Sequence, residues 1–152
     1  MKIPHPLFVL INRIMVVLLR SPLHRLFSGS ITAIGYTGRR SGRRFWVPAR
    51  YMRHDQSILV VTSMQTKWWP NFGDGLEVDL LLGGNTVQAH ASASTDQPDE
   101  IAQAMRDLWE VHPGDAAYMN VKMRGRVPDA KDFTRALEEA VLVRLVLHES
   151  FL

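Results

Sequence analysis

The sequence predicts an α+β fold in which a mostly antiparallel sheet of about six strands closes as a barrel between an N-terminal helix and other flanking helices. Short stretches rich in β-branched and aromatic residues follow one another between residues 30 and 93, separated by glycine-containing turns and by one tight connection at residues 54–56. Helical periodicity is confined to the first 20 residues and to the region after residue 96. With 152 residues, 46 % hydrophobic and 22 % charged, the chain is expected to form one domain, residues 1–152. We assign residues 1–27 to an N-terminal helical segment and residues 28–152 to the barrel with its flanking helices.

Residues 6–20 form a strongly apolar stretch that Asn12 and Arg13 interrupt. The stretch is shorter than the roughly 20 apolar residues that cross a bilayer, and it lacks the charge order and cleavage site of a signal peptide. A helix packed on the barrel or on a second subunit is the simpler interpretation. The alternative is a helix lying in a membrane interface, with Arg13, Arg20 and His24 on the edge that faces anionic lipid.

The centre of the chain alternates predicted strands with tight turns. In one of the strands Val87 and Ala89 alternate with Gln88 and His90, which indicates that one face of the strand is wet. The strands are expected at residues 30–36, 45–52, 57–62, 76–82, 86–93 and 141–147, and the glycine turns at residues 38–42, 73–75 and 83–85.

Further helices are predicted on both sides of the strands. Ser21 and Pro22 are residue types of a helix N-cap and first position, so they predict a short helix through residue 26. Pro98 begins the clearest helix, because acidic residues follow it and an apolar face then repeats until residues 112–114 end it. Two more helical pieces are expected at residues 115–122 and 129–140.

Composition and spacing exclude several kinds of site. Without cysteine the chain has no disulfide, thiolate metal site or cysteine nucleophile, and we expect a cytoplasmic protein, at the inner face of the membrane if residues 6–20 bind lipid. The six histidines lack metal-site spacing, although a haem held by one histidine stays open as a less favoured cofactor. Neither a P-loop nor a dinucleotide glycine motif is present. The net charge of +3 is concentrated locally, which indicates a small anionic partner rather than nucleic acid.

The arginine turn, residues 38–44, carries four guanidinium groups: two between its glycines at positions 38 and 42, and two directly after the second glycine. Arginine favours planar, bidentate recognition of phosphate or carboxylate, and glycines let backbone N–H groups approach an anion closely. We interpret the turn as an anion-binding site; a solvated loop is the alternative. Its candidate ligands are Arg39, Arg40, Ser41, Gly42, Arg43 and Arg44.

The tryptophan segment, residues 67–71, places two indoles and an amide beside a lysine. Adjacent residues point in different directions, so one indole is expected to face a pocket if the other faces the core. The Asn71 amide can donate and accept hydrogen bonds. Ser63, at the end of a predicted strand, is a candidate hydrogen-bond donor, but it lacks the surroundings of a serine nucleophile. The binding candidates here are Ser63, Lys67, Trp68, Trp69 and Asn71.

The order of these motifs resembles the deazaflavin-dependent nitroreductase family, split β-barrel oxidoreductases that use the cofactor F420. The resemblance covers residues 20–125 and is strongest over residues 35–93. The family pattern G-R-K-S/T-G-x-x-R-x-x-P is matched by Gly38, Arg39, Arg40, Ser41, Gly42 and Pro48, and the later W-x-x-N motif by Trp68 and Asn71.

This resemblance implies that the arginine turn and Pro48 hold the phosphate and oligoglutamate tail of F420, with the deazaflavin ring near Ser63 and the tryptophan segment. The implied reaction is hydride transfer to an electron-poor organic substrate, such as a quinone, nitro compound or enone. Ser63 and the substrate-side Tyr118 are the implied catalytic residues. FMN is the alternative cofactor. Barrels of this kind often pair, so a homodimer is a further expectation.

Three departures from the family pattern keep a second function open. Phe45 stands where the family usually has an arginine, and residues 64–66 read Met-Gln-Thr where many members have Lys-Gly-Gly. His112 and Asp115 stand at two positions that are aromatic in the family. The alternative is therefore a cofactor-free enzyme or a ligand-binding protein that uses the same barrel.

Overall fold

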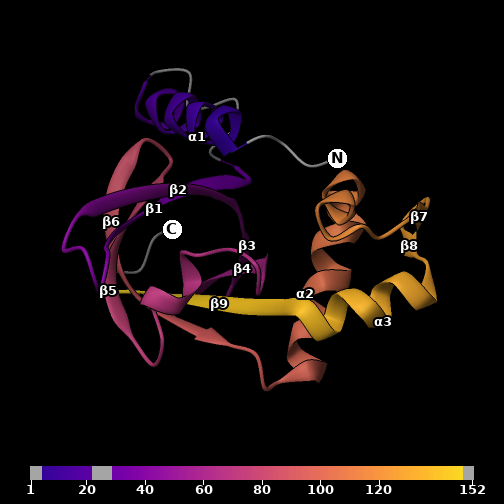
Figure 1. The fold of residues 1–152 in the computed structure, drawn as a ribbon. Coiled ribbons are helices and arrows are strands. Elements are labelled where there is room, and N and C mark those ends of the chain that lie inside the picture. The colour runs from indigo at the N-terminus through magenta and orange to yellow at the C-terminus, as the bar shows by residue number, and fades with distance from the viewer. Residues whose placement is uncertain (1–4, 22–28, 149–152) are drawn as a thin grey trace.

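The computed structural model describes residues 5–21 and 29–148 (Figure 1). Across these residues, seven strands form one antiparallel sheet that α-helices and 3-10 helices flank. The short helix predicted after Ser21 lies outside the described residues. The sheet consists of β1 (Ile31–Thr37), β2 (Arg44–Arg50), β3 (Met52–His54), β4 (Ser57–Ser63), β5 (Leu76–Leu82), β6 (Asn85–Ser94) and β9 (Ala140–Leu147).

The sheet curls because its two edges are consecutive in the chain. Its strand order is β2-β1-β5-β6-β9-β4-β3, so β2 and β3 are the edges, yet only Tyr51 separates them in the sequence. The edges can be joined by one residue only if the sheet bends back on itself, as Figure 1 shows. The predicted α+β fold with a curled, mostly antiparallel sheet is confirmed.

The predicted strand over residues 45–52 is in fact two strands. The Tyr51 N–H donates to the Ser30 carbonyl (3.0 Å), and the Tyr51 side chain is buried, so the chain leaves one sheet edge here and enters the other. A small hairpin of β7 (Met123–Arg124) and β8 (Val127–Pro128) was also not predicted. Strands of two residues are too short to show the alternation that identifies a strand.

Alternate side chains of the strands point into the curled sheet or out of it. Val78 and Leu80 belong to the interior cluster, whereas Glu77 and Asp79 between them do not. Two further apolar clusters cover the outer surface. One joins β4 and β9 to α2 (Pro98–Val111), η3 (Pro113–Met119) and α3 (Ala130–Glu139); the other joins β1, β2 and β5 to α1 (His5–Arg20).

The contact between α1 and the sheet depends on Gly35 and Trp46. The Trp46 ring lies so close to Gly35 that a Cβ added there would be 2.7 Å from the indole. The guanidinium carbons of Arg20 and Arg44 lie 4.7 and 5.3 Å from the centre of the same ring. Leu19 is buried beside this group, so the C-terminal half of α1 is fixed on the outer face of the sheet.

No helix in the described ranges is both long and apolar enough to cross a membrane.

Candidate functional site

The side chain of Asn71 joins the arginine turn to the tryptophan segment. The Oδ1 atom of Asn71 accepts a hydrogen bond from the Arg39 N–H at 2.9 Å. Its Nδ2 atom donates to the carbonyls of Trp68 (3.0 Å) and Lys67 (3.4 Å). The two stretches that the sequence singles out therefore form one continuous edge of the protein.

The arginine turn is held by its own backbone. The Gly38 N–H donates to the Arg43 carbonyl (2.8 Å), and the Gly42 N–H donates to the Gly38 carbonyl (3.0 Å). Gly42 has a φ of 67°, a conformation that glycine adopts without a steric cost. The Ser41 hydroxyl accepts from the Arg43 N–H at 3.2 Å. The turn thus presents its side chains from a defined backbone.

The four arginines of the turn differ in what they contact. Arg44, the first residue of β2, pairs with Asp79 on β5. The Arg39 guanidinium lies over the loop of the tryptophan segment, 3.5 Å from the Pro70 carbonyl and close to Gly73.

Arg40 and Arg43 are exposed, and neither has an ion-pair partner within the described residues. Arg43 lies 5.6 Å from the centre of the Phe45 ring. Two unpaired guanidinium groups therefore remain available to an anion.

Four aromatic rings form a wall beside the turn: Tyr36, Phe45, Trp68 and Phe72. Tyr36 stacks on Phe45 (5.6 Å between centroids) and meets Phe72 edge-on (5.5 Å), and Phe72 meets Trp68 at 5.6 Å. Burial raises the pKa of the Tyr36 hydroxyl, so this group stays protonated at neutral pH. Phe45 keeps 37 % of its surface exposed, so the outer end of the wall is open to a ligand.

Sequence reasoning included Trp68 in the site but missed the other three rings of the wall. A signal for two of them was available, since Tyr36 and Phe45 face each other in the register of the hairpin that the arginine turn closes. The position of Phe72 depends on the fold of the loop after the tryptophan segment, which no periodicity reveals.

Trp69 carries a polar atom without a partner. It begins the 3-10 helix η2 (Trp69–Asn71), and its ring packs partly against the interior cluster. Its Nε1 atom is buried and has no hydrogen-bond partner among the described residues. A buried donor left unsatisfied costs about 1–3 kcal/mol, so an acceptor from a bound molecule would be stabilising here.

Ser63 ends β4 and begins the loop that leads to the tryptophan segment. Its Oγ accepts a hydrogen bond from the Gln65 N–H at 3.2 Å, and its carbonyl accepts from the Thr66 N–H at 3.0 Å. The loop is therefore a compact turn, although it lacks the glycines that the family pattern has there. Exposed Lys67 follows it directly, so Ser63 is four residues from the edge that Asn71 holds together.

The structure does not bring Tyr118 to this edge. Tyr118 is 77 % exposed on η3, and η3 is tied to the far end of β2 by the ion pair of Asp115 with Arg50 (2.7 Å). Arg44 and Arg50 are the two ends of β2, about 20 Å apart at the usual strand rise. Pro48 lies between them, half-buried on the edge strand opposite Ala33, where its missing N–H is tolerated.

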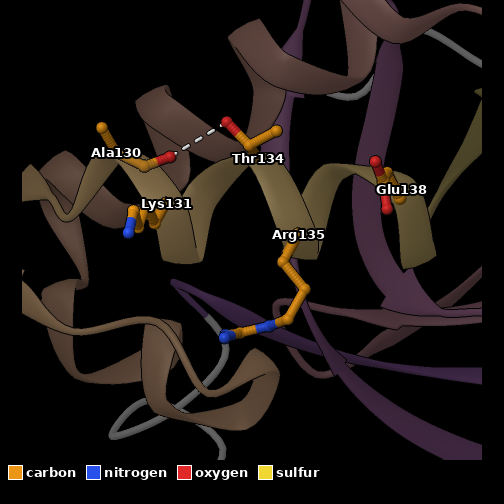
Figure 2. A pocket seen from close by; sticks show the side chains of 5 residues that line it. All are labelled: Ala130, Lys131, Thr134, Arg135 and Glu138. Atoms are coloured by element: carbon orange, nitrogen blue, oxygen red, sulfur yellow. Dashed lines mark hydrogen bonds between the residues drawn. The ribbon is translucent and has the colours of Figure 1, made fainter.

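Two open hollows lie on the surface of the described structure. One of about 440 Å³ follows the solvated face of α3, where the Thr134 hydroxyl donates to the Ala130 carbonyl (Figure 2). The other, of about 300 Å³, lies on the outer face of the sheet and includes Arg44 and Asp79. Among the described residues, no group of three or more acidic or histidine side chains is placed to hold a metal ion.

No protein-family model and no curated protein matches the chain. A solved structure of a protein of unknown function from Agrobacterium tumefaciens has a TM-score of 0.57 at 14 % identity, over 89 % of this chain and 54 % of that one, so this chain spans about half its length. A conserved hypothetical protein from Mycobacterium tuberculosis has a TM-score of 0.57 at 15 % identity, over 91 % and 81 %. The general stress FMN/FAD-binding protein of Xanthomonas citri has a TM-score of 0.54 at 20 % identity, over 84 % and 86 %. At such identities the likeness shows that these chains share one fold.

Proposed function

We propose that this chain is a reductase that uses reduced F420, with FMN as the alternative cofactor, to transfer a hydride to an electron-poor organic molecule. The observation that carries the proposal is the Asn71 side chain, which joins the arginine turn to the tryptophan segment. It makes one edge that is cationic at the turn and aromatic beside it. A flat, anionic cofactor would match both parts, because its phosphate would bind the arginines and its ring would contact the aromatic side chains.

The residues present fit such a cofactor. Arg40 and Arg43 would bind its phosphate, because their guanidinium groups are exposed and unpaired in the described structure. The aromatic wall would contact the ring system through Phe45, and the buried Nε1 of Trp69 would donate to an acceptor on it. These observations support a cofactor of this shape and charge.

When bound, the reduced cofactor supplies the hydride. The protein holds and orients the reacting molecules and stabilises the charge that develops on the substrate. The Ser63 Oγ already accepts from the Gln65 N–H, so its own proton is free to donate to a substrate oxygen. A role for Tyr118 as a second polar group on the substrate side remains a prediction. The variant Tyr118→Phe tests this role: if the rate of substrate reduction is unchanged, Tyr118 does not have it.

A binding titration tests the proposal. Purified protein is titrated separately with F420, FMN and haem, and absorbance or fluorescence reports binding. We expect dissociation constants in the micromolar range or below for F420, or for FMN if that is the natural cofactor. Binding of none of the three would leave a cofactor-free function on the same barrel as the better interpretation.

The variant Arg40→Ala/Arg43→Ala tests the cationic part of the site. Each charge-assisted hydrogen bond contributes about 1.5–3 kcal/mol, so the double variant is expected to bind the cofactor at least tenfold more weakly. The matched control is Arg124→Ala/Arg126→Ala, which removes two exposed arginines around the β7–β8 turn. An equal loss of cofactor affinity in both double variants would show that the net charge of the protein affects binding and that the arginine turn is not a specific site.

FMN is the alternative cofactor because of a protein with the same fold. The Xanthomonas citri protein that shares this fold is named for binding FMN or FAD. FMN ends in a single phosphate group, and the planar guanidinium groups of the two unpaired arginines match the geometry of a phosphate.

A further inference from the structure

The outward face of α1 is apolar and uncovered. Leu10, Ile14 and Val17 are 53 %, 50 % and 66 % exposed, and their spacing of i, i+4 and i+7 places them in one stripe. The opposite face holds Leu19, which is buried against the sheet. α1 is therefore apolar on both faces, although only one of them is needed for packing within this chain.

Positive charge surrounds this stripe. Arg13 and Arg20 are exposed on α1, and the helix contains no acidic residue. The same sign extends over the whole first third of the sequence: residues 1–54 contain ten lysines and arginines and no aspartate or glutamate, whereas residues 55–152 contain eight and fifteen. The net charge of +3 is therefore the sum of a strongly basic part, residues 1–54, and an acidic part, residues 55–152.

Within the described residues, α1 and the arginine turn, which both belong to this basic part, also lie close together in space. α1 lies along the outer side of β1 and β2 (Figure 1). At the C-terminal end of α1, Arg20 shares the Trp46 ring with Arg44, which is the last residue of the arginine turn. One side of the molecule therefore combines an exposed apolar stripe with basic side chains at its border.

We infer that this side lies on an anionic lipid surface, with Leu10, Ile14 and Val17 inserted between headgroups and Arg13 and Arg20 at the level of the phosphates. An amphipathic helix with basic residues at its polar border binds such a surface through both its apolar area and its charge. A second copy of this chain is the poorer occupant, because a symmetric pairing of α1 would bring arginines together with no carboxylate on the helix to offset them.

Vesicle sedimentation tests the inference. Full-length protein is spun with vesicles of neutral phosphatidylcholine, or of phosphatidylcholine with about one-third phosphatidylserine, so that the anionic surface potential is the variable. We expect wild type to pellet with the anionic vesicles, and Ile14→Asp/Val17→Asp to stay in the supernatant. Val127→Asp is the control, since Val127 is 67 % exposed on β8, far from α1, and should pellet as wild type does.

Arg13→Glu tests the same surface without changing the apolar stripe. Its affinity for the anionic vesicles is expected to fall about fivefold or more, with little change on neutral ones. The inference is overturned if wild type does not pellet, or if both α1 variants pellet as wild type does. It is also overturned if Ile14→Asp/Val17→Asp lowers the oligomeric mass in light scattering without lipid, because α1 is then a subunit interface. The cofactor titration is independent of every one of these outcomes.

Discussion

Asn71 shows how one side chain can determine the shape of a site whose parts are far apart in the sequence. Its amide spans 32 positions to accept from the Arg39 N–H, and it donates to two carbonyls of its own segment. All of these partners are backbone atoms. The residue is therefore needed for the relative position of turn and segment, whether or not it also touches a ligand.

Asn71→Ala is expected to lower the free energy of unfolding by about 1–3 kcal/mol, because the backbone groups lose their partner. It should also weaken cofactor binding, because the arginine turn is released from the tryptophan segment. Urea unfolding and the cofactor titration measure the two effects. Asn85→Ala, at an exposed position where β6 begins, is the control. If Asn71→Ala binds the cofactor as tightly as wild type, the arginine turn keeps its position without the Asn71 hydrogen bonds.

At the scale of elements, the β1–β2 hairpin connects the site to α1. The arginine turn closes this hairpin, and Trp46 on its outer face supports the helix. The contact is possible because β1 has no side chain at Gly35, where the Trp46 ring lies. Glycine is otherwise unfavourable within a strand, so its presence here has a packing reason.

Gly35→Ala is expected to destabilise the protein by about 1–3 kcal/mol, because the new methyl group must displace Trp46. The loss of the two arginine–indole contacts should also change the intrinsic tryptophan fluorescence. Gly114→Ala is the matched control, since a Cβ there meets nothing within 4 Å. Equal stability of the two variants would mean that the indole moves without cost.

Most elements could be predicted because their patterns are local. The hairpin of β5 and β6 follows from alternation around a glycine turn, and α2 follows from Pro98 and its apolar face. The order of the strands could not be predicted from local patterns. β9 pairs with β4 and β6, and both of these strands are far from β9 in the sequence. Two contacts at the site are also long-range: Arg44 on β2 meets Asp79 on β5 across β1, and the pair of Arg50 with Asp115 holds η3, and with it Tyr118, at the end of β2 away from the arginine turn.

Across the whole molecule, Glu77 links three strands on the outer face of the sheet. Its carboxylate on β5 contacts His148, which follows β9, and His90 on β6. Hydrogen bonds from His148 and His90 lower the pKa of the Glu77 carboxyl below its ordinary value of 4.5. A carboxyl whose pKa is lower in the folded state stabilises the fold above its ordinary pKa, and this contribution is lost as the pH falls through the lowered value.

Glu77→Gln is therefore expected to be less stable than wild type near neutral pH. The difference should shrink below pH 4.5 and disappear once the wild-type carboxyl is protonated in the folded state. Urea unfolding at a series of pH values measures it, with Glu138→Gln on the exposed face of α3 as the control. A difference that does not change with pH would show that Glu77 acts through packing.

The place of β9 in the middle of the sheet has a consequence for the order of events during synthesis. β9 leaves the ribosome after every other strand of the sheet, yet it lies between β6 and β4. Until it emerges, β6 and β4 each expose an unpaired edge, and the sheet consists of two separate pieces. Such edges can pair with other chains, so the nascent protein is most prone to aggregation just before its sheet is completed.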